Sequence, residues 1–445
     1  MDMRIRYTTR LLCAAAIPAL AISACSSPES QDKADAPATA HEHDHEHGEG
    51  HNDHDHGDGG HPGAEAGETE VRMLPTRVVY TYDGGIRTID AKTGETVEDV
   101  KKDGFLRLND AGDNRHVMVT RGNEFLTFDS GLVTKPHGDH NHYFTAQPKL
   151  TDAHFDADKA GHVVAHDGKT AMFSDGAGKA TVVDTEEIAD KDAHTHGVDT
   201  GAPHHGVTVP LSDGSVVTTA GTEEERHTIR HLDSKGKTLA ETTECPGVHG
   251  EAAAGGDKLV FGCEDGPVLF DGSQFKKLDA SAIAGADGFQ HSGTLAGSEE
   301  SSVVLADNKT DKSAADKKGK EKEHPTSVAL IDTENGSVKK VDLGGSYWFR
   351  SLARGPLGEG LVLTDDGKLN IIDPKTGEVT KTVDAIDPWQ EPEDWQGDGP
   401  ILKSHGGYAY VSDAKTKKLT VIDLHTGEVD HTVDLDDTAI EMEVL

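Results

Sequence analysis

A repeated pattern of alternating strands and Asp-to-Gly turns constrains the fold of this chain more than any other feature of its sequence. Each copy has an alternating apolar strand, an Asp, a turn that ends in Gly, and a second alternating strand. Asp accepts hydrogen bonds within such a turn and Gly adopts the positive φ, which is typical of a β-hairpin. The four clear copies are IRTIDAKTGETV (86–97), VALIDTENGSVK (328–339), LNIIDPKTGEVT (369–380) and LTVIDLHTGEVD (419–430), and IRHLDSKGKTL (229–239) is a degenerate copy.

The spacing of the copies predicts a β-propeller. Further short strands precede three of the copies, so we divide the chain into units of four strands. The blade starts then fall near residues 104, 152, 204, 248, 290, 349 and 400, after an incomplete first unit at residue 77. The stretch 438–445 would supply the missing strand of that unit and close the ring.

The blade length supports this architecture. The 369 residues from 77 to 445 make eight units of about 46 residues, an ordinary length for a propeller blade. We therefore expect an all-β chain with an eight-bladed propeller, and seven blades is the alternative. A pair of β-sandwiches would not produce so regular a repeat. Ring closure hides most strand edges, so we expect a monomer.

Residues 1–24 are expected to be a lipoprotein signal peptide. The basic stretch MDMRIRYTTR precedes LLCAAAIPALAI, an apolar run too short to span a bilayer comfortably. Small residues then lead to Cys25, as in the lipobox of bacterial lipoproteins, so Cys25 would carry lipid. An ordinary secretory signal is the alternative. The mature protein would be exported and anchored at the outer face of the cytoplasmic membrane, or be periplasmic.

Residues 25–75 are too polar to bury a core and are expected to form a disordered tether ahead of a propeller domain at 76–445. The tether contains a histidine-rich tract that would bind several Zn²⁺, Cu²⁺ or Ni²⁺ ions loosely and exchange them quickly, since ordering a flexible chain costs entropy. A plain solvated linker is the alternative. The tract histidines are His41, His43, His45, His47, His51, His54, His56 and His61.

The composition argues against a nucleic-acid partner and against an integral membrane protein. The formal net charge of −37 repels nucleic acid. A hydrophobic content of 34% is too low for an integral membrane protein. The charged insertion 307–325, inside the sixth unit, is expected to be a solvated loop, with a partner-docking loop as the alternative.

The stretch HGDHNHYF (137–144) is the sharpest candidate for a metal site. His140 and His142 would project from one face of a strand, and His137 precedes them in a turn. Three imidazoles can fill three corners of the tetrahedron that Zn²⁺ prefers, with Asp139 or a residue of a neighbouring blade at the fourth. The alternative is a polar loop rich in histidine. The stretch falls between the third and fourth strands of the second unit.

A second set of candidates recurs at the starts of successive units, where first strands would line the central channel. These residues could meet at one mouth of the channel, on the face opposite HGDHNHYF, or each could be bonded to backbone or water. The set comprises His204, His205, His249, Glu251 and His291. Five other histidines near strand ends are better explained as structural: His116, His154, His162, His166 and His405.

Cys245 and Cys263 would lie at that same mouth. With Cys13 in the signal peptide and Cys25 lipidated, these are the two that remain; such a pair in an exported protein usually forms a disulfide, which we expect, with a metal-thiolate role as the alternative. No motif assembles a nucleophile with its base, and the haem, phosphate-loop and nucleophile-elbow motifs are missing. We therefore expect a protein that is not an enzyme.

HGDHNHYF, the unit starts HHGV (204–207) and VHGEA (248–252), and the paired cysteines together resemble the periplasmic zinc metallochaperones called AztD. The resemblance covers the propeller. It implies that Zn²⁺ is captured and delivered to the solute-binding protein of a zinc ABC transporter. The lipid anchor and the long tether depart from the family. Alternative functions are a cell-surface propeller that binds protein or glycan, and a metal-dependent hydrolase or lactonase.

Overall fold

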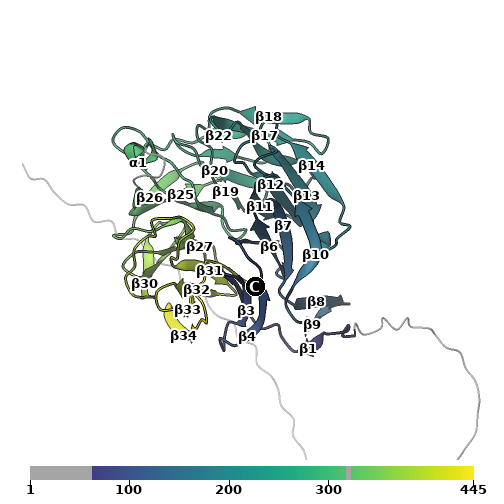
Figure 1. The fold of residues 1–445 in the computed structure, drawn as a ribbon. Helices are drawn as coiled ribbons and strands as arrows, with labels where there is room; N and C mark the ends of the chain where they lie inside the picture. Colours follow the sequence, from purple (N-terminus) through teal and green to yellow (C-terminus); the bar gives the residue numbers. More distant parts are fainter. Residues whose placement is uncertain (1–62, 317–321) are drawn as a thin grey trace, which may run out of the picture. The chain divides into compact units, whose positions relative to one another are not determined.

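The computed structural model describes residues 63–316 and 322–445, and within these ranges the strands form eight four-stranded antiparallel blades (Figure 1). Blade one comprises β35 (Glu441–Val444), β2 (Arg77–Tyr82), β3 (Gly85–Asp90) and β4 (Thr96–Lys101). Blade two comprises β5 (Arg107–Asp110), β6 (His116–Arg121), β7 (Glu124–Asp129) and β10 (Lys149–Asp156). Blade three comprises β11 (Ala160–His166), β12 (Lys169–Ser174), β13 (Lys179–Asp184) and β14 (Thr195–Asp199). Blade four comprises β15 (Thr208–Pro210), β16 (Val216–Gly221), β17 (Arg226–Leu232) and β18 (Thr238–Thr242).

The other four blades follow the same order from first to fourth strand. Blade five comprises β19 (Glu251–Ala254), β20 (Lys258–Phe261), β21 (Val268–Phe270) and β22 (Phe275–Lys277). Blade six comprises β23 (Leu295–Ala296), β24 (Val303–Asp307), β25 (Ser327–Asp332) and β26 (Val338–Asp342). Blade seven comprises β27 (Leu352–Arg354), β28 (Gly360–Leu363), β29 (Lys368–Ile372) and β30 (Val379–Asp384). Blade eight comprises β31 (Ile401–His405), β32 (Tyr408–Asp413), β33 (Lys418–Asp423) and β34 (Glu428–Asp434).

The blades close into a ring through their hydrophobic cores. Each of eight buried clusters joins two neighbouring blades, and the cluster of Tyr80, Tyr410 and Leu419 joins blade one to blade eight. The C-terminal strand β35 completes blade one, with Val444 opposite Val78 on β2. The eight-bladed propeller closed by the C-terminal strand is thus confirmed.

The repeated turn joins the third strand of a blade to the fourth. In blade seven, Asp373 Oδ1 accepts hydrogen bonds from the backbone N–H of Lys375 at 2.9 Å and of Thr376 at 2.7 Å. Gly377 then adopts a φ of +69°, which a residue with a Cβ rarely tolerates. The Asp and Gly of the sequence repeat are therefore the residues that this turn requires.

Blade two differs from the expected arrangement. The blade start expected near residue 152 is wrong, because β10 pairs with β7 as the fourth strand of blade two. The first strand of blade three instead begins at Ala160. Two extra strands, β8 (Leu132–His137) and β9 (His140–Thr145), are inserted after β7. A division of the sequence into units of four strands therefore misplaces the boundary between blades two and three. The other expected starts lie within five residues of the observed first strands.

The inserted hairpin belongs to a separate three-stranded sheet of order β1-β9-β8. Strand β1 (Thr69–Val71) lies inside the range 25–75 that the sequence assigns to the tether. Strand structure therefore begins before residue 76. The charged insertion lies between β24 and β25, in the sixth blade, and contains the helix α1 (Lys312–Asp316).

Two short 3-10 helices, η1 (Thr185–Glu187) and η2 (Phe349–Ser351), complete the described elements. Within the described ranges, each helix is too short or too polar to cross a membrane. Because neighbouring strands of a blade are antiparallel, its loops alternate between two faces. The top face carries the loops that lead into first strands. The bottom face carries the loops that join third to fourth strands.

Candidate metal centres

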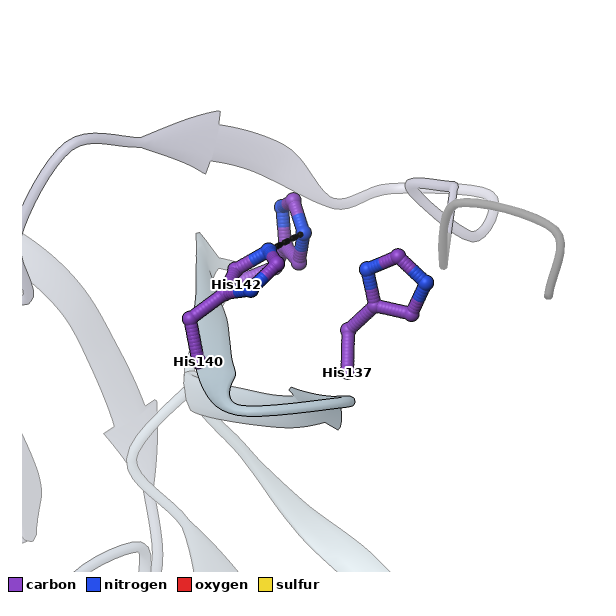
Figure 2. Close-up of side chains that lie close together, drawn as sticks. All are labelled: His137, His140 and His142. Carbon is purple, nitrogen blue, oxygen red and sulfur yellow. Dashed lines mark hydrogen bonds between the residues drawn. The ribbon is translucent and has the colours of Figure 1, made fainter.

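The hairpin cluster consists of His137, His140 and His142 (Figure 2). His137 ends β8 and His140 begins β9, so the turn between them consists of Gly138 and Asp139. His137 pairs directly with His140 across the hairpin, and one ring nitrogen from each of the three imidazoles lies within 4.8 Å of the others. The alternation of a strand places the imidazole of His142 on the same face.

Acidic side chains orient two of these imidazoles. Glu70, on β1, lies 3.1 Å from His142 Nδ1, and Asp139 lies 3.2 Å from His140 Nδ1. The contact with Nδ1 is the one that Asp139 makes to this cluster in the described residues, and its role as a fourth ligand stays a prediction. The Nε2 atoms of His140 and His142 face each other at 3.1 Å. Two nitrogens bound to one tetrahedral Zn²⁺ are about 3.3 Å apart, so this spacing suits a shared ion.

The inner cluster consists of His162, His205 and His249, and its ligand nitrogens also lie within 4.8 Å of one another. His162 lies on β11 in blade three, whereas His205 and His249 precede the first strands of blades four and five. The Nε2 atoms of His162 and His205 are 3.0 Å apart. Three neighbouring blades thus each contribute one imidazole near the start of a first strand, at the top face.

The inner cluster is oriented in the same way as the hairpin cluster. His205 Nδ1 lies 2.6 Å from Asp175 Oδ2, and His249 Nδ1 donates to the carbonyl of Gly293 at 3.0 Å. A metal-binding imidazole commonly donates its other N–H to a carboxylate or a carbonyl, which fixes its tautomer. In both clusters, therefore, anchored Nδ1 atoms leave Nε2 atoms turned toward the centre.

Burial favours the uncharged form of two imidazoles of the inner cluster, those of His162 and His249. Burial lowers the pKa of His162 well below the usual value, and the neighbouring His205 lowers it further. Burial likewise lowers the pKa of His249 to about 3. Neutral imidazole is the form that binds metal, so these two side chains are ready to bind at neutral pH.

His291, predicted from the sequence to share this site, is not part of the inner cluster. Its backbone pairs with that of Lys309, and its ring Nε2 is buried without a hydrogen-bond partner among the described residues. Burial and the Lys309 charge lower the pKa of His291 to about 4. His162 takes the place that was expected for His291.

His204 and Glu251 also lie outside the inner cluster. His204 is buried, with Nδ1 donating to the carbonyl of Ala202 at 2.8 Å and Nε2 3.2 Å from Thr219 Oγ1. Both ring nitrogens are thus occupied by protein groups. Glu251 begins β19, and burial raises the pKa of its carboxyl to about 8.

The sequence predicts a structural role for His162 because the expected start of blade three lies one strand too early. With β10 assigned to blade two, the stretch from 160 to 166 becomes a first strand and His162 becomes a residue of the ring interior. The other histidines judged structural stand apart from the two clusters. His116, for example, pairs with Asp113 at 2.6 Å, and His166 Nδ1 donates to the carbonyl of Pro210 at 2.8 Å.

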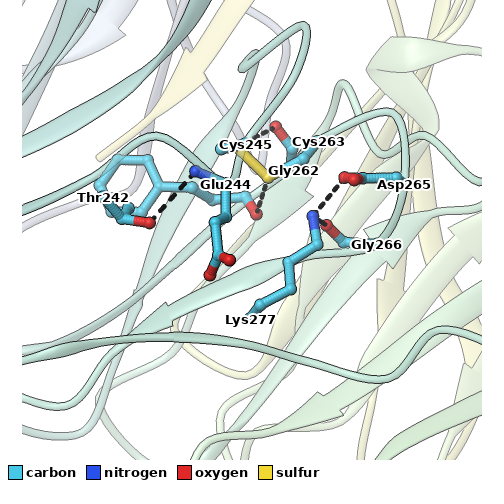
Figure 3. Close-up of a disulfide and its surroundings, with 9 residues drawn as sticks. Thr242, Glu244, Cys245, Gly262, Cys263, Asp265, Gly266 and Lys277 are labelled. Carbon is cyan, nitrogen blue, oxygen red and sulfur yellow. Dashed lines mark hydrogen bonds and ion pairs between the residues drawn. A yellow bond between two sulfur atoms is a disulfide. The ribbon is translucent and has the colours of Figure 1, made fainter.

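Cys245 and Cys263 form a buried disulfide in blade five (Figure 3). Next to this disulfide, the backbone N–H of His249 donates to the carbonyl of Gly262 at 3.0 Å. The disulfide therefore ties the loop that carries His249 to the end of β20. Cys25 and the eight tract histidines lie outside the described residues.

The sequence is similar to that of a protein described as a zinc chaperone. The chain is 27% identical to the zinc chaperone AztD of Citrobacter koseri over 341 residues, which cover 75% of this chain and 77% of the relative. Its fold is also that of two Citrobacter koseri AztD structures, with TM-scores of 0.70 for the apo form and 0.72 for the other. The chain is an AztD-like propeller.

The structural match to AztD extends over nearly the whole of the solved chains. It covers 83% and 84% of this chain and 97% and 98% of the AztD chains, at 22% and 23% identity. At these identities the match establishes the AztD fold alone. No family model matches the chain.

Proposed function

We propose that the protein is an exported zinc metallochaperone that captures Zn²⁺ and passes it to the solute-binding protein of a zinc ABC transporter. The pair of three-imidazole clusters carries this proposal, because in each cluster two Nε2 atoms lie at the spacing that suits a shared ion. The likeness to a relative described as a zinc chaperone supports zinc as the cargo.

Each cluster suits transfer because three imidazoles leave one corner of a Zn²⁺ tetrahedron open. A ligand from an acceptor protein can enter at that corner before the imidazoles leave one by one. The ion then moves between proteins without being released to water. This role is binding and transfer, with no chemical step, so the protein is proposed to act without enzymatic activity.

The two clusters are proposed to differ in how tightly they hold the ion. The inner cluster draws one ligand from each of three packed blades, so its geometry is held by the ring. The hairpin cluster lies on one hairpin, and the side chain of His140 is 56% exposed. We assign slow exchange to the inner cluster and fast exchange to the hairpin cluster, although the sequence makes the hairpin the sharpest candidate for a metal site.

The N-terminal region is proposed to place the propeller and feed it with metal. Residues 1–24 would direct export, lipid on Cys25 would anchor the chain, and residues beyond it would form the tether. The tract histidines would collect Zn²⁺ loosely near the membrane. The propeller would act as a monomer.

Titration calorimetry on the full chain, followed by transfer to a zinc-specific solute-binding protein, tests the proposal. We expect two tight sites beyond the weak binding of the tract. One should be lost in H140A/H142A and the other in H205A/H249A, whereas the exposed pair H154A/H425A serves as a control and should retain both. Transfer should exceed the rate at which a chelator removes the ion and should rise with acceptor concentration. Unaltered tight binding in the chain with all four cluster substitutions would overturn the proposal.

A further inference from the structure

His291 stands beside the inner cluster, at the top face, without belonging to it. It precedes the first strand of blade six, as His249 precedes the first strand of blade five. The two segments lie backbone against backbone, because a Cβ on Gly262 would come 1.8 Å from the carbonyl oxygen of Ser292 and 2.7 Å from that of His249. The hydrogen bond from His249 Nδ1 to the carbonyl of Gly293 joins the same two segments. His291 is therefore held next to a member of the cluster.

The side chains of His249, His291 and Lys309 surround one small space beside Gly293. A Cβ on Gly293 would lie 3.4 Å from His249 Nδ1, 3.6 Å from His291 Cε1 and 3.3 Å from Lys309 Nζ. No side chain fills this space, because residue 293 is a glycine. The ring of His291 thus borders a space that it shares with an imidazole of the inner cluster.

The Nε2 atom of His291 has no partner. It is buried and makes no hydrogen bond among the described residues. A buried nitrogen of this kind is uncommon and costs free energy, since it has lost its contact with water. His204 differs, because both of its ring nitrogens are taken by protein groups. Coordination to a metal ion would give His291 Nε2 the partner that it lacks.

Positive charge disfavours a lasting stay of an ion at His291. The backbones of His291 and Lys309 donate to each other at 2.9 Å, which holds the two residues side by side. Lys309 pairs with Asp307 at 3.0 Å, and Asp307 accepts hydrogen bonds from the N–H groups of Gly293 at 2.7 Å and Thr294 at 3.0 Å. The ammonium is therefore fixed beside the ring. A Zn²⁺ ion on His291 would be repelled by this charge.

We propose that His291 is a transient ligand of the ion that the inner cluster holds. When the ion enters or leaves, the His291 ring turns and its Nε2 takes one coordination position while one cluster imidazole is released. One Zn–N bond forms as another breaks, so the ion keeps its ligand number. This inference rests on the proposed function, because it requires the inner cluster to bind zinc.

The test measures how fast Zn²⁺ alone enters and leaves the inner cluster of the full chain, in the H140A/H142A background. Stopped flow follows entry, and an excess of a coloured chelator follows release. The kinetic phase that disappears in H205A/H249A identifies the inner cluster. The variants are H291A and H291Q, of which H291Q fills much of the ring's space without an imidazole. The matched control is H231A, which removes another imidazole with a buried, unpartnered ring nitrogen, on the third strand of blade four.

A ligand used only during passage lowers the same barrier in both directions. H291A and H291Q should therefore each slow entry and release together, by about tenfold or more, and leave the affinity within about threefold. H231A should exchange zinc at the parent rates. Parent rates in both His291 variants would overturn the transient ligand and leave the metallochaperone proposal standing. Faster release with weaker affinity would also overturn it, because His291 would then be a resident ligand. Absence of tight zinc binding at the inner cluster of the parent would remove both proposals.

A second variant tests the role of the charge beside the ring. D307N/K309M removes the ammonium together with its partner carboxylate, and the asparagine oxygen can still accept the N–H groups of Gly293 and Thr294. Zinc should then bind about threefold or more tightly at the inner cluster, because His291 can share the ion without repulsion. The same change made in the H291Q chain should give no such gain. An equal gain in the two chains, or none in either, would contradict His291 as a ligand.

Discussion

The hairpin cluster and the inner cluster each consist of three imidazoles, but different parts of the fold hold them. In each, two of the three imidazoles have an anchored Nδ1, and one pair of Nε2 atoms lies 3.0–3.1 Å apart. The imidazoles of the hairpin cluster lie on the two strands of one hairpin, to which β1 is added, whereas those of the inner cluster come from three blades. The comparison teaches that a ligand set can be read from local sequence only when one element carries it.

The largest effect is expected from the removal of His162, the proposed ligand that blade three contributes to the inner cluster. H162A should weaken zinc binding at the inner cluster about 1,000-fold or more, since even loss of an orienting partner costs 10–100-fold. H291A should leave the affinity of the inner cluster within about threefold, because His291 lies outside the group of three imidazoles proposed to hold the ion. Competition titrations against a zinc chelator measure both in an H140A/H142A background. The reverse ranking of the two variants would show that the inner cluster has been misassigned.

The disulfide should support the inner cluster and leave the hairpin cluster unaffected. The variant C245A/C263A should lose about 3 kcal/mol of unfolding free energy, the usual contribution of a disulfide that closes a loop of this size. It should also weaken zinc at the inner cluster, because the loop of His249 is no longer tied to β20. Urea unfolding and zinc titration measure the two effects. Equal weakening of both clusters would contradict a local role.

Removing an orienting carboxylate should affect one cluster at a time. D175N should weaken the inner cluster and E70Q the hairpin cluster, each by about 10–100-fold, because each amide leaves a histidine tautomer less well fixed. Titration of each variant with the other cluster removed measures the loss. A carboxylate that acts at both clusters would show that the two are not independent.

The pH dependence of stability should report the burial of His249. Its pKa is about 3 in the folded chain and about 6.5 when unfolded, so between these values the unfolded chain binds the extra proton. The metal-free protein should therefore lose stability as pH falls below about 6.5, by at most about 2 kcal/mol at pH 5 for this residue. The variant H249Q should lose less over the same range, as measured by urea midpoints at pH 7 and pH 5. Equal losses in the two chains would contradict the assignment.

The repeat was enough to predict the propeller, because a turn with Asp and Gly and two alternating strands is a local structure that recurs in every clear copy. The hairpin cluster was predictable for the same reason, since His137, His140 and His142 lie within six residues. Two contributions were not predictable. His162 depends on which strand begins blade three, and Glu70 depends on β1 pairing with a hairpin more than sixty residues away.

The central claim is that the folded chain holds two independent zinc sites, one in the ring and one on the hairpin. The most direct test is the anomalous difference density of a zinc-loaded crystal, measured on both sides of the zinc absorption edge. The account predicts one peak bounded by His162, His205 and His249 and a second bounded by His137, His140 and His142. A crystal with zinc at neither cluster, or with its zinc held only by other residues, would contradict it.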